Sequence, residues 1–280
     1  IDIYPTIIKS YFNTLIGKSA STIRINKQII TAMFESAYID EITNRNPCKN
    51  IKTPEGKKGS HRNLDITEIR TIIKLTNYHR LGPFVTFCLF TGMRRGEALA
   101  FNVNNNINFD NNTINIDKAI RFNSNQLILT STKTKAGVRT IPLFKPAKEA
   151  IANKDGLLLD KNGSYPTLST FERAWESYMK LFEEEINGIT KREYNKKLKS
   201  GVNAFKKWEN HSFRHHDLRH TFCTMLFNSN VDIKTAQKWM GHSDPETTLK
   251  IYTHLSEEKE KQSELAVNAN ILNDYINQQF

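Results

Sequence analysis

The sequence predicts a mainly helical protein with a small antiparallel β-sheet, an α+β fold divided between two domains. Three observations support this prediction. Most apolar patterns have helical spacing, short β-prone runs are confined to residues 107–143, and a stretch rich in Pro, Gly and Lys interrupts the chain near residue 55. A length of 280 residues also fits two domains, because single hydrophobic cores stop growing at roughly 250 to 300 residues.

The first domain is predicted to span residues 1–56. Helical patterns cover residues 7–15 and 22–38, and Ser21 is a suitable N-cap for the second helix. Residues 57–64 then form an exposed linker. Two helices enclose little core, so we expect this domain to be partial. The chain starts with isoleucine rather than methionine, which indicates a fragment of a longer protein.

The second domain is predicted over residues 65–280. Asp65 and Glu68 have the spacing of a capping box that opens a helix. Further along, the pattern changes to strands and then returns to helices. Helices are predicted at 65–76, 83–92, 145–153, 168–184, 216–227, 233–240, 245–254 and 257–278, with a turn into residues 94–101 and strands at 113–116, 126–130 and 138–143.

Composition limits the class of function. A hydrophobic share of 38% can build cores, while a mean hydropathy of −0.54 and the lack of an apolar run approaching ~20 residues argue against a membrane protein. No signal peptide is visible, and three cysteines without metal-ligand spacing fit reduced thiols, so a cytoplasmic location is predicted. A net charge of +11 predicts a polyanionic partner such as nucleic acid.

Four short motifs contain side chains suited to phosphate chemistry. Thr-Gly-Met-Arg places Arg94 just after a glycine turn, and His-Asp-Leu-Arg places His216 and Arg219 on one face of a helix start, where an anion is favoured. Gly-His ends a helix at His242, and Tyr252 follows ten residues later. Each motif alone has an ordinary structural explanation, such as a solvated cap or a core tyrosine. Their joint order makes those explanations weak.

This ordered set resembles the tyrosine recombinase, or phage integrase, family, and the resemblance covers residues 65–255. It implies a helical core-binding domain followed by a tyrosine-recombinase catalytic domain. It also implies an enzyme, the integrase of a mobile element. Such an enzyme exchanges DNA strands at specific sites through a 3'-phosphotyrosyl intermediate and a Holliday junction.

The resemblance also implies a role for each matching residue. Tyr252 is the nucleophile, and its phenol needs help to lose a proton because its ordinary pKa is ~10. Arg94 and Arg219 clamp the nonbridging phosphate oxygens, a task that fits two fixed guanidinium groups. The family places this arginine directly after Gly-Met, which favours Arg94 over Arg95. Glu97 supports Arg94, although an exposed helix charge is an equal alternative.

Histidines and a lysine complete the predicted catalytic set. His216 assists proton transfer near Tyr252, and His242 hydrogen-bonds the phosphate. A lysine on a β-turn supplies the acid for the leaving 5' oxygen, and we choose Lys133, with Lys135 as the alternative. The clamp consists of side chains and the sequence has no carboxylate cluster suited to Mg²⁺, so neither a cofactor nor a metal is predicted.

The predicted partner is double-stranded DNA at specific recombination sites, in a bacterial cytoplasm and at the nucleoid. Candidate DNA contacts are Arg24, Lys27, Lys135 and Arg139.

Residues 183–211 form an insertion that is long for the family, and we expect a solvated helical excursion there, with a contact to DNA or a partner as the alternative. The helix at 257–278 is predicted to pack on a neighbouring protomer in a homotetramer on DNA.

Two other functions use related residues. A type IB topoisomerase has similar chemistry, but the Gly-His motif and the helical tail after Tyr252 favour a recombinase. A noncatalytic DNA-binding protein with the same fold is the second alternative. The complete set of six catalytic residues argues against it.

Overall fold

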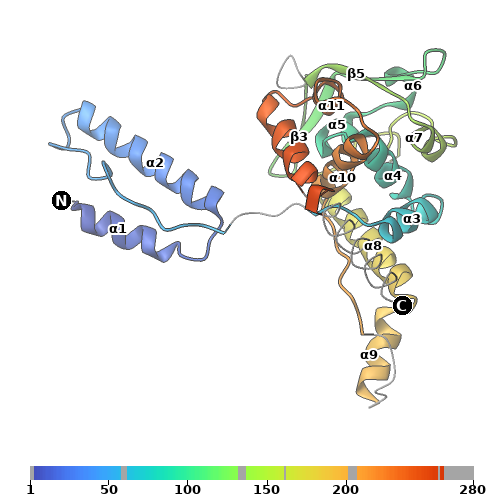
Figure 1. Cartoon of the computed structure of the whole chain (residues 1–280), viewed down its shortest axis with the longest axis horizontal. Helices are drawn as coiled ribbons and strands as arrows, with labels where there is room; N and C mark the ends of the chain where they lie inside the picture. The colour runs from blue at the N-terminus through green and yellow to red at the C-terminus, as the bar shows by residue number, and fades with distance from the viewer. Residues whose placement is uncertain are drawn as a thin grey trace, which may run out of the picture. The chain divides into compact units, whose positions relative to one another are not determined.

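The computed structural model describes residues 3–57, 62–131, 137–160, 162–200, 207–257 and 259–261. The chain divides into two compact units, Ile1–His61 and Arg62–Phe280 (Figure 1). Helices dominate and the strands are short and antiparallel, so the predicted α+β fold is confirmed. Within the described ranges, no helix is both long and apolar enough to cross a membrane.

The first unit contains α1 (Pro5–Thr14) and α2 (Ala20–Ile39). Its small core includes Phe12 and Cys48. The N-cap of α2 is Ser19, whose backbone is extended and whose hydroxyl accepts a hydrogen bond from the Thr22 amide at 3.1 Å. The prediction of Ser21 as this cap was therefore wrong. The helix starts earlier than its apolar pattern, and Ser19 is the residue placed to reach the free amides of its first turn.

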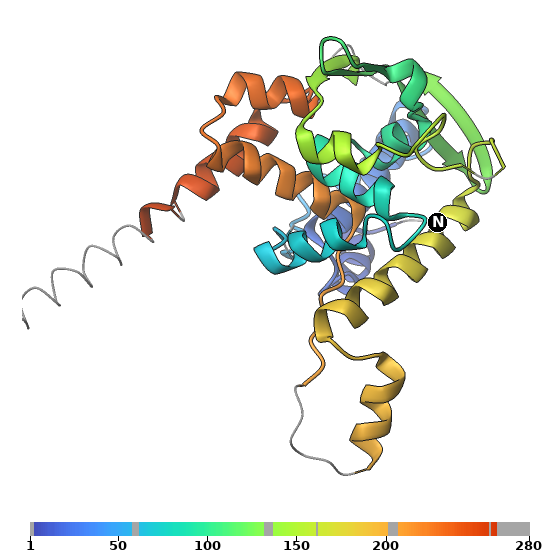
Figure 2. The same cartoon turned by 90° about the vertical axis from the view of Figure 1, so that its right-hand side faces the viewer.

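The second unit contains the remaining helices, and Figure 2 shows them from another side. The predicted capping box of the first is present, because Asp65 accepts from the Glu68 amide and Glu68 accepts from the Asp65 amide. The helices are α3 (Ile66–Leu75), α4 (Gly82–Thr91), α5 (Arg95–Ala100), α6 (Val103–Asn106), α7 (Lys145–Ala150), α8 (Leu168–Asn187), α9 (Lys191–Lys199), α10 (His215–Asn228) and α11 (Ile233–Met240), and residues 245–257 form a further helical stretch.

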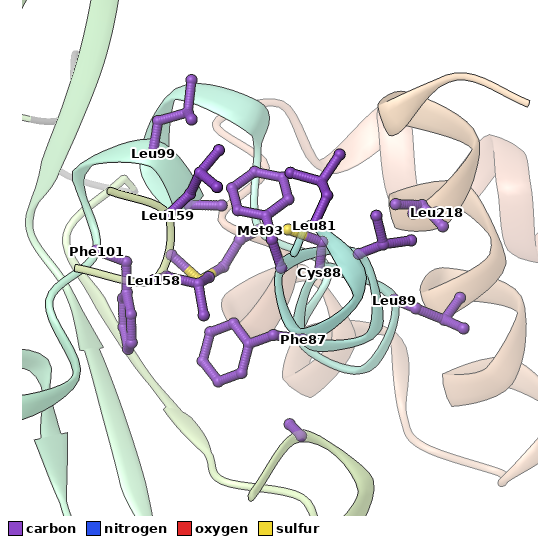
Figure 3. Close-up of a cluster of buried hydrophobic side chains, with 14 of the residues drawn as sticks. Leu81, Phe87, Cys88, Leu89, Met93, Leu99, Phe101, Leu158, Leu159 and Leu218 are labelled. Atoms are coloured by element: carbon purple, nitrogen blue, oxygen red, sulfur yellow. The ribbon is translucent and has the colours of Figure 1, made fainter. Parts of the chain in front are cut away.

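The centre of the second unit is α4, which is apolar around most of its circumference. A helix of this kind must be surrounded by other elements. It packs against α3, α7 and α10. In Figure 3, Phe87 lies toward Phe101 and Leu158 on one side, and Leu89 lies toward Leu218 of α10 on the other. The two chain segments that carry Arg94 and Arg219 are therefore joined to one core.

Two small sheets flank this core. One has the order β1-β2-β5, formed by β1 (Ile107–Asn108), β2 (Thr113–Ile116) and β5 (Arg139–Pro142). The other is a hairpin of β3 (Lys118–Asn123) and β4 (Gln126–Ser131). The prediction of a single sheet is corrected to two, and β1 and β3 are additional strands. β1 is too short, and β3 too polar, to show a clear alternating pattern.

Gly96 lets the hairpin approach α5 closely. A Cβ atom at this position would lie 2.4 Å from the carbonyl oxygen of Ile120 in β3. Because no side chain larger than hydrogen fits, the glycine fixes the distance between the hairpin and the helix that follows Arg94.

Gly92 ends α4 with a left-handed backbone, at φ +62°. A Cβ atom here would lie 2.4 Å from Cδ1 of Phe222 and 3.2 Å from Sδ of Met240. The position therefore needs glycine for two reasons, its backbone conformation and its lack of side-chain volume. The turn that it makes aims the next residues at the arginine cluster described below.

We predict that Gly92→Ala lowers the free energy of unfolding by on the order of 3 kcal/mol, because backbone strain and overpacking act together. The matched control is Gly163→Ala, at φ +75° with no heavy atom within 4 Å of the added carbon. Strain alone should cost the control ~1 to 2 kcal/mol. Urea unfolding of both variants measures the difference, and equal losses would contradict a packing role for Gly92.

Candidate active site

Arg94 is the N-cap of α5 and is held by two other segments. Its backbone amide and Nη1 donate to the carboxylate oxygens of Glu97, both at 2.8 Å. Its Nη2 donates to the carbonyl of Gly241 at 2.8 Å. The side chain nevertheless remains 43% exposed. Both terminal nitrogens of the guanidinium are thus held by hydrogen bonds, while the exposed part of the group is open to a ligand.

Arg95, the alternative to Arg94, points elsewhere. Its guanidinium lies over the ring of Phe171, 5.7 Å from the centroid, and it lines a pocket with Trp175 and His216. The structure therefore places Arg94, and not Arg95, against Glu97 and Gly241.

Arg219 lies on α10 and is buried, with 3% of its surface exposed. Its Nη1 donates to the carbonyl of Gly92 at 2.7 Å, and its Nη2 donates to the carbonyl of Met240. These carbonyls belong to the C-terminal ends of α4 and α11, where the helix dipole favours a positive charge. Burial, followed by the charges of Arg94 and Arg139, lowers the pKa of Arg219 to about 9, so it stays charged at neutral pH.

Glu97 is buried and contacts a second arginine, Arg139 of β5. Arg139 donates to the two carboxylate oxygens at 2.8 and 3.1 Å, and its Nε donates to the carbonyl of Trp239 at 2.8 Å. Burial by itself raises the pKa of Glu97, but hydrogen bonds and charges from Arg139 and Arg94 outweigh it and lower the pKa to about 2. Glu97 is thus a buried carboxylate and not an exposed helix charge.

The position of Arg139 corrects its predicted role as a DNA contact. Its side chain is only 2% exposed, and its donors face Glu97 and backbone carbonyls. It therefore positions Glu97, which in turn contacts Arg94. The sequence offered one indication that Arg139 is buried. It lies at the start of a strand whose alternate positions, the first and the third, face the interior.

His242 follows the glycine that ends α11 and enters the same cluster. Its Nδ1 is 2.7 Å from Oγ1 of Thr248. Burial, and then the charges of Arg219, Arg94 and Arg139, lower the pKa of His242 to about 3, so the ring is neutral at physiological pH. Next to it is a cavity of about 660 Å³, lined by residues of β2, β5 and α11.

Thr248 is a site residue that the sequence analysis did not identify. It is completely buried, and its hydroxyl fixes the orientation of His242. One signal was available, because Thr248 precedes Tyr252 by four residues and shares a face of the same helical stretch. Buried threonines are common in helices, so this spacing alone indicated no function.

His216 lies on the first turn of α10, three residues before Arg219. It is exposed, whereas Arg219 is buried beneath it. His216 is also one of the groups whose charge lowers the pKa of His242, which places the two histidines in the same electrostatic environment. The start of α10 therefore carries an exposed histidine and, three residues later, a buried arginine.

Tyr252 follows His242 by ten residues in the sequence, but its hydroxyl is bonded to a segment outside the arginine cluster. The hydroxyl donates to the carbonyl of Val231, between α10 and α11, at 3.1 Å, and the ring packs edge-on against Phe227. Burial, and then the charges of Cys223 and Asp232, raise the pKa of Tyr252 to about 12. Its phenol therefore hydrogen-bonds a backbone carbonyl outside the arginine cluster.

Some predicted site residues lie elsewhere. Arg24 is exposed and Lys27 half-buried, both on α2 of the first unit. Lys133 and Lys135 lie outside the described residues, as does most of the predicted C-terminal helix at 257–278.

A second polar cluster involves Asp65, Glu68 and His211, whose ligand atoms lie within 4.8 Å of one another. Nη1 of Arg62 contacts both carboxylate oxygens of Glu68 at 2.8 Å. Its Nη2 donates to the carbonyl of His211 at 2.6 Å. Arg62 already supplies a positive charge to Glu68, so this cluster is an ion-pair network that joins the start of the second unit to the segment before α10.

Fold and site together define a catalytic domain of the tyrosine-recombinase class. The sequence model of the Phage integrase family matches residues 62–259. Because this match covers most of the chain, the protein belongs to the phage integrase family.

Two relatives illustrate the range of similarity. A tyrosine recombinase XerC-like protein of Caldanaerobacter subterraneus subsp. tengcongensis is 26% identical over 268 residues, which are 89% of this chain and 66% of the relative. The ICEBs1 integrase of Bacillus subtilis is 25% identical over 247 residues, 83% of this chain and 61% of the relative. The chain thus spans less than two thirds of the length of these proteins.

Solved structures share the fold. The integrase of transposon Tn1549, in complex with a circular intermediate DNA, matches with a TM-score of 0.69 at 20% identity, over 90% of this chain and 81% of that chain. A lambda integrase dimer bound to a COC' core site matches with a TM-score of 0.55 at 14% identity, over 90% of this chain and 65% of that chain.

We predict that Glu97→Gln lowers the free energy of unfolding at pH 7 by about 3 to 5 kcal/mol, because it leaves buried Arg139 without a counter-charge. The folded-state pKa of about 2 lies below the ordinary value of 4.5. The stabilisation is therefore present above pH 4.5 and is lost as the pH falls toward 2. Urea unfolding from pH 7 to pH 3 should show the difference between wild type and variant shrinking with acid.

The control for this measurement is Glu149→Gln. Glu149 forms an exposed ion pair with Lys145 at 3.9 Å, and such pairs contribute at most about 1 kcal/mol. Two results would contradict the central role of Glu97. One is a Glu97→Gln variant as stable as this control, and the other is a loss of unfolding free energy that does not change with pH.

Proposed function

We propose that the protein is a site-specific recombinase of a mobile element, which cuts and rejoins double-stranded DNA through a 3'-phosphotyrosyl link to Tyr252. The observation that carries the proposal is the arginine cluster. Arg94 and Arg139 contact the carboxylate of Glu97, and the charge of Arg219 acts on all three groups. Three guanidinium groups and one carboxylate leave an excess of positive charge. An anion is needed to balance this charge at the exposed edge of Arg94.

A scissile phosphate fits this position. Arg94 would contact one nonbridging oxygen through its exposed edge, and Arg219 would supply charge from below. The neutral ring of His242, held by Thr248, would donate a hydrogen bond to the phosphate. These groups are fixed before DNA arrives, so they would stabilise the growing charge of the transition state without reorganising.

The nucleophile must change its position before it reacts. At pH 7 a phenol whose pKa is about 12 is ionised in on the order of one molecule in 100,000. Leaving the carbonyl of Val231 costs about 1 kcal/mol of hydrogen bonding and brings the phenol toward the arginines, whose charge would lower its pKa. His216, exposed at the start of α10, would assist this proton transfer.

Cleavage forms a bond between Tyr252 and the phosphorus and releases the 5' oxygen. We propose Lys133 as the acid that protonates this oxygen, with Lys135 as the alternative. The phosphotyrosyl link keeps the phosphoester energy, so a 5' hydroxyl from another strand can attack it without a nucleotide or metal cofactor. Two such exchanges pass through a Holliday junction.

The assembly is the remaining part of the proposal. The solved relatives named above are bound to DNA, which supports duplex DNA as the partner. We propose a homotetramer on a specific recombination site, joined through the helix at 257–278, and action at a bacterial nucleoid.

We predict that Tyr252→Phe abolishes covalent joining to DNA and leaves DNA binding unchanged, because only the nucleophilic oxygen is removed. The probe is a pool of nicked duplexes with randomised sequence around the nick. Adducts that resist denaturant are isolated and their DNA is sequenced, which also identifies the preferred site. Tyr78→Phe, at a 74% exposed tyrosine, is the control and should form adducts normally.

Two results would contradict the proposal. One is an adduct that persists in Tyr252→Phe. The other is rapid relaxation of supercoiled plasmids that lack the selected sequence, because it indicates a topoisomerase.

We further predict that Thr248→Val slows adduct formation about tenfold, since loss of one hydrogen bond of about 1.4 kcal/mol frees the ring of His242. Thr248→Ser keeps the hydroxyl and should retain most of the rate. Single-turnover kinetics on the selected nicked duplex measures both. If the two variants react equally fast, Thr248 has no part in positioning His242.

A further inference from the structure

The insertion at residues 183–211 forms a projection that the proposed chemistry does not use. α8 ends at Gly188 in a left-handed conformation, and α9 starts with a capping box between Thr190 and Glu193. Figures 1 and 2 both show α9 beyond the end of α8, away from the rest of the second unit. No residue of α9 is buried, so core packing does not explain this helix.

The projection is nevertheless fixed at its base. Asn187 and Glu209 exchange two hydrogen bonds of 3.0 Å between the side-chain amide of one and the backbone of the other. The ring of Tyr194 meets Trp208 edge-on at 5.6 Å, and Nζ of Lys191 lies 3.8 Å from the centroid of Trp208. The Tyr194 side of α9 therefore packs on the returning segment, which sets the direction of the opposite side.

That opposite side carries a basic stripe of Arg192, Lys196 and Lys199. Spacings of four and three residues place them on one face, away from Tyr194. All three are exposed, and none forms an ion pair with another residue in the described ranges. Like charges at these spacings repel each other, so the stripe destabilises the isolated helix. The stripe extends over about 10 Å of helix length.

We propose that this stripe binds phosphates of the DNA backbone, outside the segment held by the arginine cluster. The inference rests on the proposed function. Stable protein interfaces usually need an apolar or aromatic anchor at their centre, and the stripe has none. A DNA duplex instead presents one phosphate charge per ~1.7 Å of its axis, so a row of cations can bind it in any register.

The position of α9 relative to the catalytic residues agrees with this role. Glu176 of α8 lines a pocket together with His216 of the active site. From Glu176 to Asn187 the helix continues for eleven residues, which is about 16 Å. α8 therefore extends about 16 Å beyond the pocket that it shares with His216, and α9 with its stripe lies past that end, outside the segment of DNA that the arginine cluster would hold.

The test measures noncovalent binding to a 50-base-pair mixed-sequence duplex as a function of salt, with Tyr252→Phe present in every protein so that no adduct forms. The variant Arg192→Gln, Lys196→Gln, Lys199→Gln should reduce the slope of log K against log salt by about 2 to 3, since each lost phosphate contact removes about 0.9. The matched variant Arg192→Lys, Lys196→Arg, Lys199→Arg keeps the charge and should keep the slope.

An unchanged slope in the glutamine variant would overturn the assignment of the stripe to DNA. If the slope is unchanged and the glutamine variant loses binding to polyglutamate, the stripe binds an acidic protein partner, and the assignment to DNA is overturned. Failure of the proposed function is distinguishable, because it appears in a different assay: the protein with Tyr252 intact would form no adduct with the nicked duplexes. Adduct formation retains the proposed function whatever the stripe does to the salt slope.

Discussion

The site depends on the buried carboxylate of Glu97 and the guanidinium groups that share it. Three clustered cations would repel one another and expel Arg219 and Arg139 toward water if nothing balanced them. Glu97 supplies one negative charge, and the carbonyls at the C-terminal ends of α4 and α11 supply partial charges of the same sign. The cluster therefore joins α4, α5, α10, α11 and β5. Its balance remains incomplete, which is the basis of the phosphate site proposed above.

The proposed phosphate clamp is preformed, whereas the proposed nucleophile points elsewhere. Arg94, Arg219 and His242 are held by hydrogen bonds that do not require DNA, whereas Tyr252 bonds to Val231 and has a raised pKa. The protein would thus bind a backbone phosphate without attacking it. Attack requires a shift of the helical stretch that carries Tyr252, and the same stretch holds Thr248 beneath His242. In the proposed mechanism, a shift that releases Tyr252 from Val231 would therefore also move the residue that orients His242.

Sequence patterns predicted the fold well where local physics controls the chain. α11 begins and ends at the predicted residues, because Asp232 caps it and Gly241 terminates it. The capping box of α3 was equally clear from its spacing. Prediction failed where contacts between distant segments decide the outcome. The two-residue β1 exists only because β2 pairs with it, and the start of α2 follows from the cap at Ser19.

By itself, the sequence determined the family and proposed a set of catalytic residues, because few side chains other than these can perform phosphate chemistry. Only the tertiary structure decided how they are used. Arg139 lies 42 residues from Glu97, and Thr248 is buried beneath His242, so no local pattern shows that one positions a carboxylate and the other a histidine. The direction of the Tyr252 hydroxyl likewise depends on Val231, 21 residues away, and on the packing that buries the ring.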